Sequence, residues 1–285
     1  MDHLENANDH GKKKGRKSRK QNEKEIYNEY VGEIERERSL AKQRKTYENM
    51  QYLSVNERTT FDNKFTKPKN HHQEDYVNHL RNKNRKIIVA SGPAGTGKTL
   101  FATEYGVRNF LLGNYEKLIF TRPSVTVDEE LGFLPGTLEE KMAPWVRPIY
   151  DVLYTFVSPK EVQELMEDKI IEIAPLGFMR GRTFKNAWIV ADEMQNSTIS
   201  QMKMLLTRLG ENSRIVITGD LEQHDRVGEI NGMEDFLGKF KGKRSSSISS
   251  FEFDRSDIQR EEVVKEVLDI YSGDLPTTYV EDADI

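Results

Sequence analysis

Hydrophobic residues are unevenly distributed along this chain of 285 residues. Between residues 67 and 273, short apolar runs alternate with longer segments in which apolar residues recur at helical spacing. This alternation is typical of a parallel sheet whose strands are joined by crossover helices, so it predicts an α/β fold. We expect strands at residues 86–90, 117–121, 170–173, 187–191, 214–218 and 248–253, and helices at residues 98–112, 138–156, 159–167, 199–209 and 257–271.

Apolar positions are scarce on either side of this core. Residues 1–22 are expected to form a disordered basic arm, because the stretch from Lys12 to Lys20 is rich in cations and has nothing to bury. Residues 23–66 form a charged extension with sparse apolar positions, which we expect to be helical. Residues 274–285 form an acidic tail that should fray. The globular core is therefore predicted to span residues 67–273.

Composition narrows the class of protein. Hydrophobic residues make up 36% of the chain and charged residues 32%, which is consistent with exposed segments outside a single core. The formal net charge of -4 does not by itself indicate a nucleic-acid-binding protein. The chain has no cysteine, which excludes disulfides and thiolate metal sites and favours a cytoplasmic location. No apolar run is long enough for a membrane span, and the basic N-terminus lacks the apolar stretch of a signal peptide.

The strongest local pattern is a glycine-rich segment between the first predicted strand and the first predicted helix. Its backbone amides and the positive end of the helix are suited to bind phosphate oxygens. Lys98 would then reach the β- and γ-phosphates, and the Thr99 hydroxyl would hold Mg²⁺. The chain is therefore predicted to bind a nucleoside triphosphate. The predicted phosphate-binding residues are Gly92, Pro93, Ala94, Gly95, Thr96, Gly97, Lys98 and Thr99.

Two more motifs stand at the ends of later strands. Asp192 and Glu193 follow strand 187–191, where Asp192 would hold the Mg²⁺ shell through water and Glu193 would polarise the attacking water as a general base. Gln223 follows strand 214–218 and would contact the γ-phosphate, since ligands of α/β ATPases lie at this edge of the sheet. A solvated acidic turn and an ordinary Gly-Asp turn are the alternatives.

Together with further motifs, this order resembles the PhoH family of P-loop ATPases over roughly residues 70–240. The resemblance implies the helicase-like branch of RecA-type ATPases, with Lys98 and Asp192 on neighbouring strands. It also implies ring-shaped homo-oligomers, with a hexamer as the expected assembly. The family usually has alanine where this chain has Met194 and an apolar residue where it has Arg226. The matching motifs are residues 92–99, 121–123, 131–136, 144–151, 174–176, 180–183, 192–196, 206–210 and 218–225.

The resemblance also suggests residues that would select and activate the nucleotide. Gln73, nineteen residues before Gly92, stands where helicase-like relatives recognise adenine through the donor and acceptor of an amide. This role would make the nucleotide ATP; the alternative is a surface glutamine. A cation on the γ-phosphoryl group, often supplied by a neighbouring subunit, is also needed. The candidates are Arg180, Arg182, Arg208 and Arg260, each of which has a structural salt bridge as its alternative.

Single-stranded nucleic acid is the expected partner. Arg122 ends strand 117–121, where helicase-like relatives contact single strands, and the arm from Lys12 to Lys20 could bind phosphates without sequence preference. The arm could instead be a solubilising tail or a docking segment for an acidic protein. Residues 1–66 carry no spaced acidic set on apolar strands, so we expect neither a nuclease domain nor nuclease activity.

Two functions remain open at this point. In the first, the protein is an ATPase that remodels RNA or single-stranded DNA. In the second, it is a nucleotide-dependent regulatory module that organises an RNA-processing partner. The phosphate loop alone would also permit a small-molecule kinase, but Glu193 and Gln223 favour water as the phosphoryl acceptor.

Overall fold

The computed structural model describes residues 55–123, 138–223 and 231–260, and four helical positions at 263, 264, 267 and 270. All of them belong to the second of the chain's two units, Leu53–Ile285. The basic arm, residues 23–54 of the extension and the acidic tail lie outside the described residues, as do the family motif at 131–136 and Arg226. Residues 258–260 are not helical, so the helix predicted for 257–271 begins later than expected.

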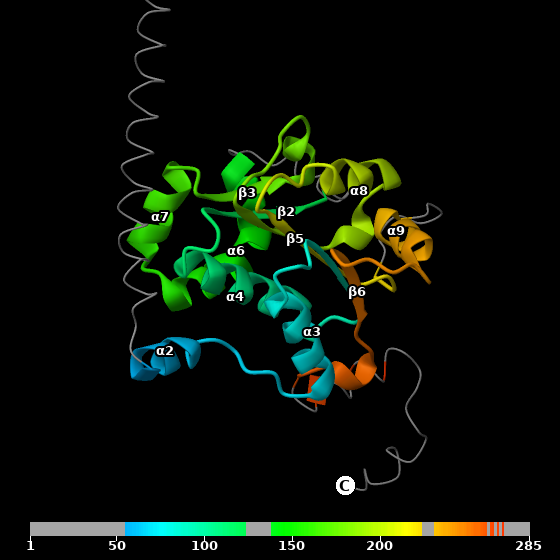
Figure 1. The fold of residues 1–285 in the computed structure, drawn as a ribbon, viewed down its shortest axis with the longest axis horizontal. Coiled ribbons are helices and arrows are strands. Elements are labelled where there is room, and N and C mark those ends of the chain that lie inside the picture. The colour runs from blue at the N-terminus through cyan, green and yellow to red at the C-terminus, as the bar shows by residue number, and fades with distance from the viewer. Residues whose placement is uncertain are drawn as a thin grey trace, which may run out of the picture. The chain divides into compact units, whose positions relative to one another are not determined.

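Six parallel strands form one sheet in the order β3-β2-β4-β5-β1-β6 (Figure 1). Each strand lies within two residues of its predicted range, which confirms the α/β fold. The strands are β1 (Ile87–Ser91), β2 (Lys117–Arg122), β3 (Ile171–Pro175), β4 (Ala187–Ala191), β5 (Arg214–Gly219) and β6 (Ile248–Glu252).

The expected strand order is wrong in one respect. Strand β1, which leads to Lys98, pairs with β5 and β6, whereas β4, which leads to Asp192, pairs with β2 and β5. Strand β5 therefore separates them, and Lys98 and Asp192 do not follow neighbouring strands. Apolar runs that are buried on both faces do not encode their own partners, because tertiary packing decides the pairing. The inserted strand brings Thr218 between the two motifs.

Helices cover both faces of the sheet: α3, α4, α6 and α7 lie on one face, and α8 and α9 on the other (Figure 1). Helices α3 and α9 were not expected from the hydrophobic pattern. No helix in the described part of the chain has the length and apolarity needed to cross a membrane. The helices are α2 (Val55–Asp62), α3 (His71–Arg81), α4 (Lys98–Leu111), α6 (Leu138–Phe156), α7 (Pro159–Glu167), α8 (Ile199–Leu206) and α9 (Gly232–Phe240), with short 3-10 turns η1 (Leu176–Met179), η2 (Met194–Asn196) and η3 (Arg255–Asp257).

Successive strand residues point to opposite helical layers, because side chains alternate along a strand. Ile189 and Ile217 belong to a buried cluster with Met233 of α9. Trp188 faces the other layer, where its indole nitrogen donates to the Ala102 carbonyl of α4 at 3.1 Å. Both faces of the sheet are therefore covered by helices. The ends of the strands are left accessible, and we call them the carboxyl edge and the amino edge of the sheet.

The segment that precedes α3, which includes Phe61 and Phe65, also packs onto the core. Phe61 and Phe65 are buried, and the Phe65 ring stacks on Phe156 of α6 with centroids 4.3 Å apart. Thr66 follows, and its amide and hydroxyl both donate to the Glu104 carboxylate at 2.7 Å. The C-terminal part of the charged extension is thus attached to the helical layer that carries α4.

Candidate nucleotide site

The glycine-rich loop joins the carboxyl end of β1 to the start of α4. Gly92, Gly95 and Gly97 have φ values of 132°, 86° and 92°, a region that residues with a Cβ rarely enter. Gly92 also has no room for a side chain, since a Cβ there would lie 2.4 Å from the Phe253 carbonyl oxygen. Gly97 is the N-cap of α4 and makes no side-chain cap. The first amides of α4 are therefore available to bind phosphate oxygens.

Lys98 begins α4 and is only 7% exposed. Its ammonium donates to the carbonyl oxygens of Gly92 and Pro93, both at 2.6 Å. Burial lowers the pKa of Lys98, while the charges of Asp220 and Asp192 act in the opposite direction. The ammonium is thus held inside the loop by two carbonyls, whose place phosphate oxygens can take as stronger, charged acceptors.

Thr99 and Asp192 meet at this edge although they are 93 residues apart. The Thr99 hydroxyl donates to Asp192 Oδ1 at 2.8 Å, and the buried Thr218 hydroxyl donates to the same oxygen at 2.5 Å. Hydroxyl and carboxylate oxygens are the ligands that Mg²⁺ prefers, so this donor set fits the predicted metal. Thr218 was not predicted, because its strand was not expected beside Asp192.

The carboxylate of Glu193 is held by a residue that the sequence analysis did not single out. Glu193 Oε2 accepts from Gln195 Nε2 at 2.6 Å. Gln195 is buried, its Oε1 accepts from the Asp220 amide at 3.1 Å, and its Nε2 also donates to the Gln223 carbonyl at 3.3 Å. Gln195 therefore ties the Glu193 carboxylate to the loop that follows β5. Its place in the family motif at 192–196 was the available signal.

Glu193 also has an unusual backbone. Its φ of 53° lies in the left-handed region, which costs a residue with a Cβ on the order of 1 kcal/mol. Gly219 accommodates the bend, since a Cβ there would lie 2.8 Å from Gln195 Oε1. The Glu193 carboxylate that follows this turn faces the side chain of Gln195.

Gln223 reaches this network only through its backbone. Its carbonyl accepts from Gln195, and its amide donates to the Asp220 carbonyl at 3.1 Å. The side chain is exposed, and residues 224–230 lie outside the described part of the chain. Contact between the Gln223 side chain and a γ-phosphate stays a prediction.

Gln73 lies beside the phosphate loop and is only 3% exposed, so the surface alternative is wrong. Its Nε2 donates to the Thr96 carbonyl at 3.0 Å, and its Oε1 accepts from the Lys69 amide at 2.8 Å. The side chain therefore supports the loop directly. The NH₂ group and the carbonyl oxygen of the Gln73 side chain each retain the capacity for one more hydrogen bond. Adenine recognition by Gln73 stays a prediction.

Arg182 and Arg208 form contacts within the chain. Arg182 Nη2 donates to both oxygens of Glu172 at 2.9 and 2.7 Å, and its guanidinium lies 4.6 Å from the centre of the Phe184 ring. Arg208 donates to the Met204 carbonyl at 3.2 Å and to the Arg182 carbonyl at 3.1 Å. A role in a neighbouring site would require both guanidinium groups to leave these partners.

Arg180 and Arg260 are exposed, and neither forms an ion pair with another described residue. Arg260 lies against the phosphate loop of its own chain: its Nε is 2.6 Å from the position that a Cβ on Gly95 would take. The adjacent Gln259 amide donates to the Gly95 carbonyl at 3.0 Å. Arg260 is therefore placed beside its own site, and Arg122 ends β2 at the same edge of the sheet.

The loops at this edge together provide what phosphate chemistry needs. The phosphate loop provides free amides and the Lys98 ammonium, Thr99 and Asp192 provide oxygens for a divalent cation, and Glu193 provides a carboxylate next to them. Such a site can bind a phosphate chain with its metal and accept a proton from water.

Solved helicase structures cover much of this chain at low similarity. The Pif1 helicase from Candida albicans covers 76% of this chain and 47% of its own length, with 14% identity and a TM-score of 0.37. The Sulfolobus solfataricus SWI2/SNF2 ATPase core in complex with dsDNA covers 66% of this chain and 46% of its own, with 18% identity and a TM-score of 0.38.

Curated relatives are more similar in sequence. A PhoH-like protein of Bacillus subtilis (strain 168) is 43% identical over 200 residues, which are 70% of this chain and 61% of the relative. Protein PhoH of Escherichia coli (strain K12) is 38% identical over 217 residues, which are 74% of this chain and 60% of the relative. This chain thus spans about 60% of the length of these two relatives. The model of the family described as PhoH-like protein matches residues 65–272, and the chain therefore belongs to that family.

Proposed function

We propose that this protein is a Mg²⁺-dependent ATPase that acts on RNA or single-stranded DNA. The contact between Thr99 and Asp192 carries the proposal. It joins two segments 93 residues apart at the end of the phosphate loop, and the next residue, Glu193, is a carboxylate. Metal ligands beside a base are the requirement for water-driven phosphoryl transfer.

In the proposed reaction, the loop amides and Lys98 bind the β- and γ-phosphates of ATP. Glu193 accepts a proton from a water molecule whose oxygen bonds to the γ-phosphorus. The bond between the γ-phosphorus and the oxygen shared with the β-phosphate breaks, so ADP and inorganic phosphate leave. Gln195 positions the base, because its hydrogen bond to one carboxylate oxygen of Glu193 leaves the other oxygen to face the water.

Thr99 and Asp192 would hold the metal, because their oxygens already converge on one point next to the loop. A bound Mg²⁺ supplies positive charge that offsets the charge of the phosphate oxygens. Thr218 keeps Asp192 oriented toward Thr99 through its own hydroxyl. A further positive charge on the γ-phosphoryl group would come from an arginine of a neighbouring subunit.

Two features support nucleic acid as the substrate. Arg122 ends β2 at the same edge of the sheet as the phosphate loop. A single-stranded nucleic acid bound at Arg122 would therefore lie beside the nucleotide. The arm from Lys12 to Lys20 would add sequence-independent contacts with phosphates. A regulatory module that organises an RNA-processing partner is the competing function, and the first experiment separates the two.

We further propose that the protein works in the cytoplasm as a homo-oligomer, with a hexameric ring as the expected form. The described unit has one phosphate-binding core, so a second wall of the site would come from a neighbouring subunit. The exposed Arg180 is the arginine best suited to reach across, since Arg182 and Arg208 are engaged within the chain and Arg260 lies beside its own loop. Specific activity should then fall on dilution, and activity independent of concentration would exclude the shared site.

The test is steady-state ATP hydrolysis by the full chain, with and without single-stranded RNA. Glu193→Gln should lower turnover by at least about 100-fold while retaining ATP binding, because the amide cannot accept the proton. Glu222→Gln is the matched control: this carboxylate lies in the loop after β5, is 75% exposed, and should change turnover less than twofold.

Hydrolysis that rises with RNA would support the nucleic-acid ATPase. Hydrolysis that depends on Glu193 but ignores RNA and single-stranded DNA would favour the regulatory module. Equal turnover in Glu193→Gln and the wild type would refute the proposed base.

A further inference from the structure

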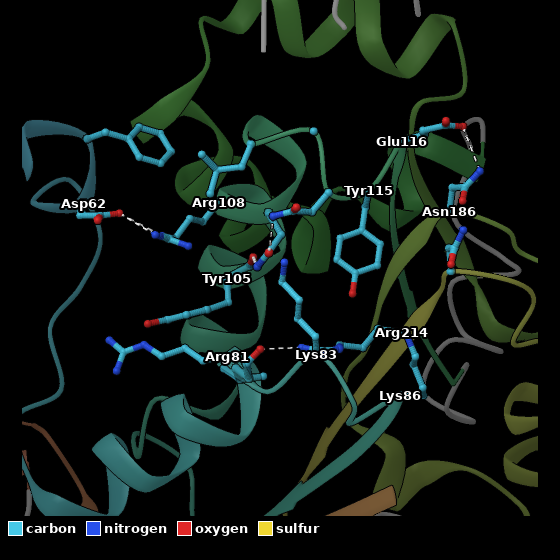
Figure 2. A pocket seen from close by; sticks show the side chains of 17 residues that line it. Asp62, Arg81, Lys83, Lys86, Tyr105, Arg108, Tyr115, Glu116, Asn186 and Arg214 are labelled. Carbon is cyan, nitrogen blue, oxygen red and sulfur yellow. Dashed lines mark hydrogen bonds and ion pairs between the residues drawn. The ribbon is translucent and has the colours of Figure 1, made fainter. Parts of the chain in front are cut away.

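A pocket lined by many polar side chains lies at the amino ends of the strands (Figure 2), whereas the phosphate loop follows the carboxyl end of β1. Its volume is about 600 Å³, within the range typical of sites for small molecules. Lys86 and Arg214 line it from the starts of β1 and β5, and the C-terminal parts of α2, α3 and α4 form the facing walls. The proposed ATPase reaction uses none of these residues.

The pocket has an excess of positive charge. Five cationic side chains and two carboxylates, those of Asp62 and Glu116, line the pocket. The formal charge of the lining is therefore +3. The helix C-termini that face the pocket carry partial negative charge, which offsets a part of this excess. The five cations are Arg81, Lys83, Lys86, Arg108 and Arg214.

Arg214 is the buried member of this group, with 2% of its surface exposed. Its two terminal nitrogens donate to the carbonyl oxygens of Leu80 and Asn82, at the end of α3, and its Nε has no partner among the described residues. These bonds give Arg214 a structural role as a cap of α3. They do not neutralise its charge, because no carboxylate among the described residues pairs with it.

The other four cations divide into two pairs. Arg81 and Arg108 are neutralised by carboxylates: Arg81 by Glu74 at 3.0 Å and Arg108 by Asp62 at 2.8 Å. Lys83 and Lys86 form no ion pair with any described residue. The two ammonium groups and the buried guanidinium therefore form no ion pair with a described carboxylate.

Neutral donors complete the lining. Figure 2 shows the Lys83 side chain reaching into the hollow and the Tyr115 hydroxyl directed toward the same space. Burial raises the pKa of Tyr115, so its hydroxyl stays a donor over the whole physiological range. Asn114 and Asn212 add amide groups. A site rich in donors and positive charge, and of this volume, suits a compact anion with many acceptor oxygens.

We propose that this pocket binds a phosphate ester of the size of a nucleotide, at a site separate from the phosphate loop, with Lys83, Lys86 and Tyr115 as the contacts to its oxygens. Arg214 supplies long-range attraction from behind them. The phosphate group itself, or the nucleoside attached to it, can provide the recognised chemistry, and the two arms of the experiment distinguish these sources.

The experiment measures pyrophosphate binding by calorimetry with the full chain carrying Lys98→Ala, which removes the main phosphate contact of the loop. The test variant adds Lys83→Ala and Lys86→Ala; neither residue is buried, so the fold should be retained. The matched control adds Lys160→Ala and Lys243→Ala, which remove the same charge from exposed positions elsewhere. Thermal unfolding of each protein confirms that the variants are folded.

Saturable binding that weakens at least tenfold in the test variant and less than twofold in the control supports the proposal. Absence of saturable binding of both pyrophosphate and ADP, or equal weakening in both variants, overturns it. A second arm repeats the series with ADP: a lysine-dependent gain over pyrophosphate identifies the nucleoside, and equal affinity identifies the phosphate group.

Trp188 provides an independent readout of where the ligand lies. The Arg214 guanidinium is 5.1 Å from the centre of its ring system, and the Tyr115 ring is 5.4 Å away. In a background that also carries Trp145→Phe, Trp188 is the sole tryptophan, since the chain has two. Pyrophosphate should change its emission with the same midpoint as the heat signal, and unchanged emission at saturation would place the ligand elsewhere.

Discussion

At the carboxyl ends of the strands, Thr99, Asp192 and Thr218 bond to one another through their side chains, whereas at the amino ends Ser213 and Arg214 bond to the backbone. Thr99 donates to Asp192 at the first edge. At the second edge, the Ser213 hydroxyl donates to the Phe184 carbonyl at 2.8 Å and Arg214 donates to the end of α3. The bonds among Thr99, Asp192 and Thr218 can be exchanged for bonds to a ligand, whereas the bonds from Ser213 and Arg214 to carbonyls hold the ends of elements in place.

Residues proposed to serve hydrolysis therefore lie at the carboxyl ends of the strands, and residues that stabilise the fold lie at the amino ends of the same strands, five or six residues away. Substitutions of the hydroxyls that contact Asp192 should change hydrolysis and leave unfolding nearly unaffected. Substitutions at the amino edge should do the reverse, apart from Lys83 and Lys86, whose ammonium groups form no ion pair with a described residue.

The largest effect is expected at the amino edge, from Arg214→Met. Two buried carbonyls would lose their donors, so the free energy of unfolding should fall by about 3 kcal/mol. Hydrolysis per folded molecule should be retained. Urea unfolding measures the loss, and Arg85→Met is the control, because Arg85 caps Ser245 and Ile248 from a less buried position and should cost about 1 kcal/mol. A loss of ATP affinity in folded Arg214→Met would contradict the separation of the two edges.

A smaller effect, of the opposite kind, is expected from Thr218→Val at the carboxyl edge. The substitution preserves shape but removes the hydroxyl that orients Asp192, a hydrogen bond whose loss should lower turnover about tenfold. The free energy of unfolding should change by less than about 1 kcal/mol. Turnover at saturating Mg²⁺ and urea unfolding provide the two numbers. Thr155→Val, on the exposed side of α6, should leave both unchanged, and a large loss of stability in Thr218→Val would break the comparison.

The smallest effect concerns a contact near the phosphate loop that depends on pH. The hydrogen bond and charge of Asp257 raise the pKa of His72, with smaller contributions from Asp254 and Asp75 and a smaller opposing effect of burial. A raised folded-state pKa means that the stabilisation is complete below the unfolded value of 6.5 and is lost as pH rises through the folded value. Thermal unfolding of wild type and His72→Gln should therefore differ at pH 5.5 and converge by pH 8.5. A difference that stays constant, or grows with pH, would refute the assignment.

The elements of this fold could be predicted where the signal is local. Strands β1, β2, β4 and β5 each contain a run of three or more apolar residues, and the phosphate loop combines Gly92, Gly97 and Lys98 within eight residues. Helix α3 was missed because its buried face includes Gln73 and its other positions are mostly polar. Helix α9 was missed because it begins with Gly232 and contains Gly238, residues that weaken a helical pattern.

The site could be predicted only as far as its local motifs. Asp192 and Glu193 follow their strand directly, so the pattern identified them. Thr218 and Gln195 depend on which strands are neighbours and on how the chain turns after Glu193, and neither is encoded in one segment. The partners of Arg182 and Arg208 are set in the same way by tertiary contacts.

Strand β5 carries Arg214 at one end and Thr218 near the other, about 13 Å apart at the usual rise of a strand. All six of its residues are buried, and it pairs with β1 on one side and β4 on the other. A shift by one residue would turn every side chain of the strand to the opposite face. The length and register of β5 therefore fix the distance between Arg214 at one end of the sheet and Thr218 at the other. A change in this distance would require the backbone hydrogen bonds of β5 to β1 and to β4 to break together.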